Sequence, residues 1–416
     1  MPSVSHRAVL PPLLLLLGLA AMAALYAWSG DAYFALRHAA GMQPFAPFLD
    51  LHGVMSAIAC WHEGVDVYAA NGCDALNRLH VYSPLWLRLP PVFGAPALLA
   101  PIGIGLALEF ILSLLVLPAP ERMGAAVLLV LAAVSPDTVF ALERANMDVL
   151  IFVAVVAAVP LLGGGLAART AAYGVFLAVG LLKFYPLVLL GLLVRETPRV
   201  ALGLGVAVLA VVAVAVLPMA GEYGRAIANI LPTPAFTGTF GGRHLALGLA
   251  QLWPGHGVAA ALVGVLVALV AVVVAVRVAA DAAMVAAMNA LPRRHADLCL
   301  VGAMLTLGCF LAGESVEYRA IFLVLAMPAL LRLGGRIRLF MVSAGIVAWL
   351  LWDPLVRRVV AWLAPGGEVP SVPGLVVWAV RELLWWWVAA VLAGLIVGLL
   401  HRAPLLVEAR GRLGFR

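Results

Sequence analysis

The sequence predicts an all-α polytopic membrane protein that forms a single integral membrane domain over residues 1–416. Apolar residues make up 65% of the chain and charged residues 11%, and the mean hydropathy is +1.10. Soluble domains are about half apolar and about a quarter charged. The net charge of +6 is interpreted as the excess of basic residues in cytoplasmic loops. No basic run alternates with aromatic residues, which argues against a nucleic-acid partner.

Hydrophobic segments recur along the chain, and about ten of them are expected to span the membrane fully. The first is counted as a span, with a cleaved signal peptide as the alternative. Arginines between the segments place those connections in the cytoplasm, so three longer connections, 30–93, 219–256 and 353–374, are expected on the outer side. The segments lie at about 8–29, 94–117, 124–142, 148–166, 171–194, 200–218, 257–276, 297–313, 318–333, 339–352 and 375–400.

Segment 171–194 breaks the alternation, because Arg169 and Arg195 flank it at both ends. We expect a re-entrant hairpin of two short half-helices that turns near Phe184-Tyr185-Pro186. Proline removes a backbone donor and disfavours helix at the residue before it, and broken helices at membrane depth are tolerated where they line a polar cavity. The alternative is one kinked span, with inverted topology downstream.

Lys183 is the only lysine of the chain, and it lies within this hydrophobic segment. A lone ammonium group at bilayer depth is costly and usually marks a site. The sequence offers no acidic residue close by along the chain. We therefore expect a counter-ion or an anionic ligand near Lys183, and the rest of the chain favours an anionic ligand carried by lipid.

The first outer loop is expected to contain an amphipathic helix at the membrane surface, with Asp50 at its start. Apolar residues recur there at helical spacing. Asp50 can cap the helix by accepting first-turn N–H groups, and it is equally placed to take a proton from a hydroxyl group. Cys60 and Cys73 share the loop, and in an oxidising compartment they are expected to form a disulfide. The apolar face comprises Leu51, Val54, Met55, Ile58, Trp61 and Val65.

Several short motifs follow one another in a characteristic order. After Asp50 and the helix come Gly64-x-Asp66-x-Tyr68, Tyr82-x-Pro84-Leu85, Asn146 at a helix start, and Lys183-x-x-Pro186. Over residues 45–190 this order resembles glycosyltransferase family 87 of the GT-C superfamily. One departure is Glu143-Arg144-Ala145 before Asn146, where family members tend to have Gly-Gln.

The resemblance implies a GT-C-like bundle whose active site lies at the outer face of a bacterial cytoplasmic (inner) membrane. It implies a polyprenyl-phosphate sugar donor, with Asp50 as general base. The expected reaction moves a mannose-like hexose or a pentose to a lipid or glycan acceptor by direct displacement with inversion. Such chemistry needs one base and cations for the departing phosphate, and no metal or cofactor is expected.

The candidate phosphate-binding residues are Lys183, Arg144 and Arg319. For each arginine the alternative is an ion pair with a neighbouring glutamate. His244 lies in a loop that could cover the site, with a solvated loop position as its alternative. The residues expected to contact substrate are His52, Tyr82, Asn146, Asp148, Tyr185, His244 and Glu317.

Two other functions remain open at this level. A transporter or flippase for lipid-linked sugars would share a cationic cavity, but it should need polar groups at both membrane faces. A non-catalytic assembly subunit would not depend on Asp50 or Lys183. The polar residues other than arginine gather on the predicted outer side, which favours the enzyme.

Overall fold

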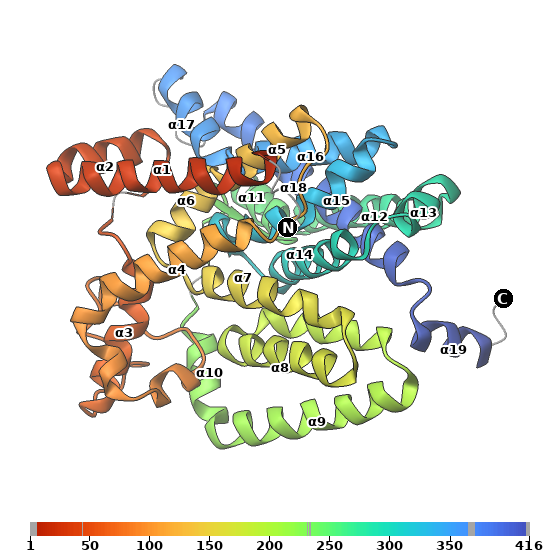
Figure 1. The fold of residues 1–416 in the computed structure, drawn as a ribbon. Coiled ribbons are helices and arrows are strands. Elements are labelled where there is room, and N and C mark those ends of the chain that lie inside the picture. The colour runs from red at the N-terminus through yellow and green to blue at the C-terminus, as the bar shows by residue number, and fades with distance from the viewer. Residues whose placement is uncertain (1–5, 44, 231, 233, 365–370, 413–416) are drawn as a thin grey trace. The chain divides into compact units, whose positions relative to one another are not determined.

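A computed structural model describes residues 6–43, 45–230, 232, 234–364 and 371–412, and it is almost entirely helical (Figure 1). The chain folds into two compact units, each built from separate stretches of sequence. Unit 1 comprises Met1–Phe45, Ile111–Ala141 and Thr233–Leu399, and unit 2 comprises Ala46–Phe110, Leu142–Pro232 and Leu400–Arg416. The prediction of an all-α polytopic membrane protein is confirmed at this level.

Unit 1 has a helical core in which consecutive helices pack against one another. The central helix α15 is buried along nearly its whole length, and it packs between α14 and α16. The sheet of this unit is a single antiparallel pair of two-residue strands, β1 (Thr239–Phe240) and β2 (Ser315–Val316). The helices are α1 (His6–Trp28), α2 (Gly30–Ala39), α5 (Met123–Ala133), α11 (His244–Leu252), α12 (Gly257–Ala280), α13 (Ala282–Asn289), α14 (Arg293–Ala312), η7 (Glu317–Phe322), α15 (Leu323–Gly334), α16 (Arg338–Leu351), α17 (Asp353–Leu363) and α18 (Val372–Leu400).

Unit 2 combines a loop-rich part with a set of longer helices. Helices α7, α8 and α9 lie side by side (Figure 1). The loop-rich part holds α3 (Leu49–His62), η1 (Pro84–Arg88), η2 (Pro91–Gly94) and η3 (Pro96–Leu98). The remaining helices are α7 (Met147–Ala158), η4 (Val159–Gly163), α8 (Leu166–Lys183), η5 (Tyr185–Arg195), α9 (Pro198–Val216), η6 (Leu217–Met219), α10 (Ala220–Ala228) and α19 (Pro404–Arg412), while α4 (Leu99–Leu114) and α6 (Pro136–Glu143) contribute residues to both units.

Eight helices of the described chain are long and apolar enough to cross a membrane, or nine if a pair bent by 63° is counted as one span. The bent pair is α16 and α17. The predicted segments 148–166 and 318–333 instead form shorter elements. Arg7 and Arg332 both contact Glu121. Two arginines that are expected on the cytoplasmic side therefore lie close together. The eight candidate helices are 6–28, 96–114, 123–143, 166–183, 198–228, 257–280, 293–312 and 372–400.

The chain reverses direction where the hairpin is predicted. Phe184 has φ 59°, which ends α8, and η5 then returns along α8 instead of continuing it. The Tyr173 hydroxyl donates to the carbonyl oxygen of Leu192 at 3.1 Å, and Arg169 pairs with Glu196 at 2.9 Å. The predicted turn is therefore present, but its first arm is a helix of 18 residues and not a half-helix.

The predicted helix of the first outer loop is present as α3, although its environment differs from the expectation. Leu51, Val54, Met55 and Ile58 are all buried within the protein, where α3 packs against η1 and η2. A Cβ atom on Gly94 of η2 would lie 2.8 Å from the Ala59 backbone nitrogen. These four residues are covered by the chain itself, so most of the apolar face of α3 packs within unit 2, while Val65, just after the helix, is exposed.

The other two predicted outer loops also contain helices. The connection 219–256 holds α10, β1 and α11, and the connection 353–374 begins with α17. Residues 365–370 of the latter lie outside the described residues. The sequence predicts loops here because α10 and α17 are short and each carries both acidic and basic residues among its apolar ones.

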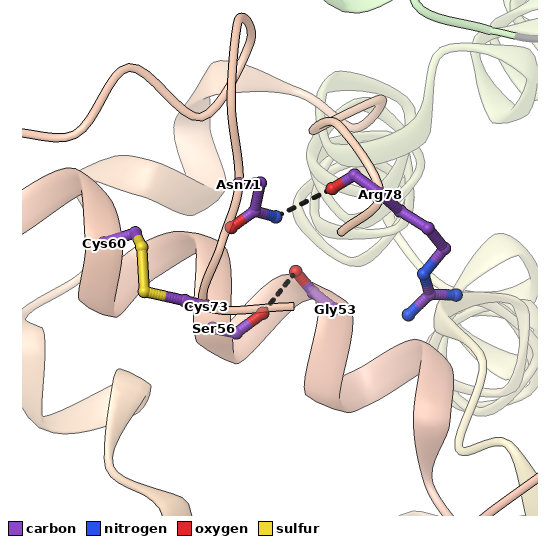
Figure 2. Close-up of a disulfide and its surroundings, with 6 residues drawn as sticks. All are labelled: Gly53, Ser56, Cys60, Asn71, Cys73 and Arg78. Carbon is purple, nitrogen blue, oxygen red and sulfur yellow. Dashed lines mark hydrogen bonds between the residues drawn. A yellow bond between two sulfur atoms is a disulfide. The ribbon is translucent and has the colours of Figure 1, made fainter. Parts of the chain in front are cut away.

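The predicted disulfide joins Cys60 of α3 to Cys73, with the two Cα atoms 6.1 Å apart (Figure 2). We expect replacement of both cysteines by serine to lower the free energy of unfolding by about 3 kcal/mol, because the cross-link limits the unfolded chain. Thermal unfolding of the purified protein measures this loss. As a control, thiol labelling of denatured, unreduced protein should modify only the free cysteines, Cys299 and Cys309. Labelling of all four residues would contradict the prediction.

Candidate functional site

Asp50 lies in the first turn of α3, yet it does not cap the helix. The N-cap residue is Phe48, which has left-handed backbone geometry with φ 63°, and no side chain makes the cap hydrogen bond. The backbone amides at this end instead find acceptors in the segment before α7. Phe48 N donates to Glu143 O at 2.7 Å, and Asp50 N donates to Arg144 O at 3.2 Å. The capping alternative is therefore wrong, and the Asp50 carboxylate is available for other contacts.

The two oxygens of the Asp50 carboxylate have different partners. Oδ1 accepts from Arg144 Nη2 at 2.5 Å and from Arg78 Nη1 at 3.2 Å. Oδ2 accepts from the neutral Asn146 Nδ2 at 2.6 Å. The carboxylate is thus held through Oδ1 by two cations, while Oδ2 receives one uncharged donor.

The charge of Asp50 follows from these contacts. Its side chain is only 6% exposed, and burial by itself raises the pKa of a carboxyl group. The hydrogen bond and positive charge of Arg144, with smaller contributions from Asn146 and Arg78, outweigh burial and hold the pKa of Asp50 below its usual value. Asp50 is therefore ionised at neutral pH, as a general base must be before it accepts a proton.

Asn146 connects Asp50 to the only lysine. It is the N-cap residue of α7, and its Oδ1 accepts from Asp148 N at 2.9 Å. The same oxygen accepts from Lys183 Nζ at 2.9 Å, while Nδ2 is turned toward Asp50. Ala145, just before it, has φ 44°, an uncommon backbone conformation that recurs at functional sites.

Lys183 has a counter-ion, which the sequence analysis missed because the two residues are far apart in the chain. Its Nζ atom lies 2.7 Å from Asp148 Oδ1, and the two side chains are 7% and 0% exposed. The Tyr185 hydroxyl donates to the same oxygen at 2.5 Å, and Nζ lies 5.5 Å from the centroid of the Tyr82 ring. Three of the predicted site residues, Asp148, Tyr185 and Tyr82, therefore surround the ammonium group of Lys183.

We call the connected set Asp50, Arg78, Arg144, Asn146, Asp148 and Lys183 the Asp50 network. All of its members lie in unit 2. Two of the candidate residues on its margin are His52 and Tyr82. His52 Nδ1 is 3.7 Å from Asp74 Oδ1. The other histidine of α3, His62, lies at its C-terminal end and contacts Leu89 O at 2.8 Å.

The remaining predicted site residues, His244, Glu317 and Arg319, belong to unit 1. His244 is fully buried, so the solvated-loop alternative is wrong. Its Nε2 atom is 2.6 Å from Thr239 Oγ1, and its Nδ1 atom is 3.1 Å from Glu382 Oε1. This chain of hydrogen bonds ties β1 to α18.

The two candidate arginines lie in different units and have different contacts. Arg144 contacts Asp50. Glu317 pairs with Arg357 at 2.5 Å, while Arg319 donates to Ser315 Oγ at 3.0 Å. Burial raises the pKa of Glu317, and the Arg357 charge opposes that effect.

Unit 1 also contains a buried charged cluster that the sequence analysis did not find. Arg381 in α18, 1% exposed, bonds both Asp353 Oδ2 at 3.3 Å and Glu382 Oε1 at 2.7 Å. Asp137 is fully buried, with neither carboxylate oxygen hydrogen-bonded within the described residues. A sequence signal was present, because acidic and basic residues inside apolar segments are rare.

In unit 2, Arg78 and Asp74 are functional candidates that the sequence patterns above did not indicate. Arg78 donates to Asp74 through Nε at 2.9 Å and through Nη2 at 2.8 Å. The signal was their spacing of four residues in a loop that already held the candidate base. That spacing was overlooked because the segment has no helical pattern.

Comparisons with protein-family models, with curated proteins and with solved structures found no match. The Asp50 network offers an ionised carboxylate with one oxygen bound to cations. It also offers a buried ammonium group and two guanidinium groups from separate parts of the chain. Together these can accept a proton at one point and stabilise an anion at another.

Proposed function

We propose that the protein is a membrane glycosyltransferase that uses a polyprenyl-phosphate sugar as donor. One observation carries the proposal. Asp50, Asn146 and Lys183, which come from three separate motifs of the family resemblance, are joined by direct hydrogen bonds in one network. The sequence separations are 96 and 37 residues, so nothing in the local sequence requires these side chains to meet.

The geometry supports a direct displacement. The acceptor hydroxyl oxygen forms a bond to the anomeric carbon, and its proton passes to Oδ2 of Asp50. The bond from that carbon to the phosphate oxygen breaks, and its electron pair leaves with the polyprenyl phosphate. Inversion at the anomeric carbon follows from attack opposite the leaving group. We assign a mannose-like hexose or a pentose as the sugar, and a lipid or glycan hydroxyl as acceptor.

The cations of the network supply the electrostatic part of the reaction. Charge develops on the departing phosphate, and Lys183 and Arg144 are the groups placed to stabilise it. Asp148 and Tyr185 hold the ammonium group of Lys183 in one position. A buried cation acts more strongly than one in water, because the surroundings screen it less.

We further propose that α8 and η5 form a re-entrant hairpin and that the site opens to the outer face of a bacterial inner membrane. Arg169 and Glu196 pair at the open end of the hairpin, which supports a common side for both arms. Single cysteines at positions 169 and 196 should therefore both react with a thiol reagent applied from the cytoplasm. A control cysteine at Trp253, which is exposed, should react from outside. Labelling of 169 and 196 from opposite faces would rule out the hairpin.

Transfer by the purified protein tests the function directly. Proteoliposomes are supplied with polyprenyl-phosphate mannose carrying a radiolabel in the sugar, together with a bacterial lipid extract as acceptor. We expect label to leave the donor and appear in a new product. Movement of intact donor between leaflets without cleavage would instead indicate the flippase. Absence of both with folded protein would favour an assembly subunit.

A further inference from the structure

Arg78 and Arg144 come from different segments and bond the same oxygen of Asp50. Arg78 Nη1 lies 3.2 Å from Asp50 Oδ1, and Arg78 Nη2 donates to Leu49 O at 2.8 Å. One guanidinium group therefore bonds both the backbone and the carboxylate of the first turn of α3. Arg144 reaches the same Oδ1 from the segment before α7.

Asp74 fixes the Arg78 guanidinium in place. The two side chains form a bidentate pair, at 2.9 Å from Nε to Oδ2 and 2.8 Å from Nη2 to Oδ1. The backbone N–H of Arg78 donates to Oδ2 as well, at 3.0 Å. Such forked pairs are strong and directional. The Asp74 side chain is fully buried and that of Arg78 is 34% exposed, so the carboxylate anchors the cation.

The segment that carries this pair is itself tied to α3. Cys73, directly before Asp74, is cross-linked to Cys60 of α3, and Asn71 Nδ2 donates to Arg78 O at 2.8 Å (Figure 2). Arg78 passes close over Gly53, where a Cβ atom would lie 2.7 Å from Nη2. We call Asn71, Cys73, Asp74 and Arg78 the Arg78 clamp.

We propose that Arg78 is a positioning residue for the transfer reaction, which holds Asp50 through Oδ1 so that Oδ2 faces the acceptor hydroxyl. This role rests on the proposed function. It differs from phosphate binding, which is the role proposed for Lys183 and Arg144. A side chain bonded on two sides cannot move far, and displacement of a reacting group by about 1 Å can cost about 100-fold in rate.

Loss of Arg78 also changes the electrostatics of the base. Arg144 remains as the direct cation on Asp50, and the neutral Asn146 remains on Oδ2. With one cation removed, the carboxylate binds a proton more readily, so its pKa rises. Other charged or titratable groups lie one contact further from Asp50. Asp74 pairs with Arg78 and has His52 beside it, while Lys183 bonds Asn146 and pairs with Asp148.

The experiment compares the pH dependence of transfer in Arg78→Gln and the wild type. A general base works in its deprotonated form, so activity falls as the pH falls through its pKa. A raised pKa therefore moves the acidic limb of the kcat/KM profile to higher pH. We expect this shift, together with a fall in kcat of about 100-fold. Arg78→Lys retains charge but loses the fork, so it should restore the limb and recover kcat only in part.

Arg88→Gln is the matched control. Arg88 lies in the same loop-rich part and pairs with Glu222 at 2.5 Å, outside the Asp50 network, and its variant should keep the wild-type profile. An unchanged acidic limb in Arg78→Gln would overturn the proposal, even if kcat fell. If that variant does not fold, Asp74→Asn frees the guanidinium group but keeps its positive charge beside Asp50. In that variant kcat should fall without a shift of the limb to higher pH, and a wild-type kcat would overturn the proposal.

A second readout separates this proposal from the proposed function. Infrared titration in lipid nanodiscs identifies the protonated Asp50 carboxyl band as the one missing from Asp50→Asn. In Arg78→Gln the band should appear at higher pH than in the wild type. If the band shifts in Arg78→Gln but the wild type has no transferase activity, the proposed function is refuted and the contact between Arg78 and Asp50 is retained. Transfer by the wild type with an unshifted band would refute the role of Arg78 alone.

Discussion

Asp50→Asn is expected to reduce kcat by about 1000-fold, within the range for loss of a general base. The substitution keeps the size of the side chain and leaves an oxygen that can still accept from Arg144 and Arg78. It removes the negative charge and the oxygen that would take the proton. Donor binding and expression should be largely retained. The measurement is initial rate in proteoliposomes, with donor binding followed separately.

Asp66→Asn is the control for this variant. Asp66 lies in the same loop, where Oδ1 accepts from Tyr68 N at 3.2 Å and Oδ2 pairs with Arg225 at 2.5 Å. These contacts fix the turn before Tyr68 and lie outside the Asp50 network, so replacement of Asp66 should leave kcat near the wild-type value. Normal turnover by Asp50→Asn would remove Asp50 as the base, and Asp31 and Asp66 would then be the carboxylates to test.

Lys183→Ala should lower kcat/KM for the donor by at least about 30-fold, the lower end of the cost of removing one partner of a buried charge pair. Lys183→Arg should restore donor use only in part, because arginine is larger and forked. The structure adds a second effect. Asp148 is fully buried and would lose its counter-ion, so Lys183→Ala should also lower thermal stability.

The double variant Lys183→Ala, Asp148→Asn separates these two effects. Without the buried carboxylate there is no uncompensated charge, so stability should recover relative to Lys183→Ala. Donor use should not recover, because the cation is still missing. Recovery of both properties together would show that Lys183 serves only to balance Asp148.

The sequence was sufficient to predict the helical membrane class, α1, the helix after Asp50, the chain reversal at Phe184 and the disulfide. Each of these depends on local signals: apolar length, helical spacing, an X-Pro step and two nearby cysteines. The partners of Asp50 and Lys183 depend on contacts between distant segments. Whether Asp50 caps its helix, and which residue pairs with Lys183, could not be decided without the tertiary structure.

The membrane segments show the same division between local and tertiary information. Segments 318–333 and 339–352 are apolar enough to suggest spans. The first instead forms η7 and α15, which is buried in protein, and the second forms α16, the first helix of a pair bent by 63°. Hydropathy does not distinguish a helix that faces lipid from one that faces other helices. The charged cluster around Arg381 was missed for a related reason, since its members lie in different elements.

The separations within the Asp50 network have a consequence for the order in which the protein folds. Cys60 and Cys73 are 13 residues apart, so that loop can close early, at small cost in chain entropy. Asp50 can contact Arg144 and Asn146 only after a further 94 and 96 residues have been synthesised. Lys183 follows 37 residues after Asn146. Contacts of such high contact order form slowly, and during synthesis the site is complete only once α8 has emerged and reached α7.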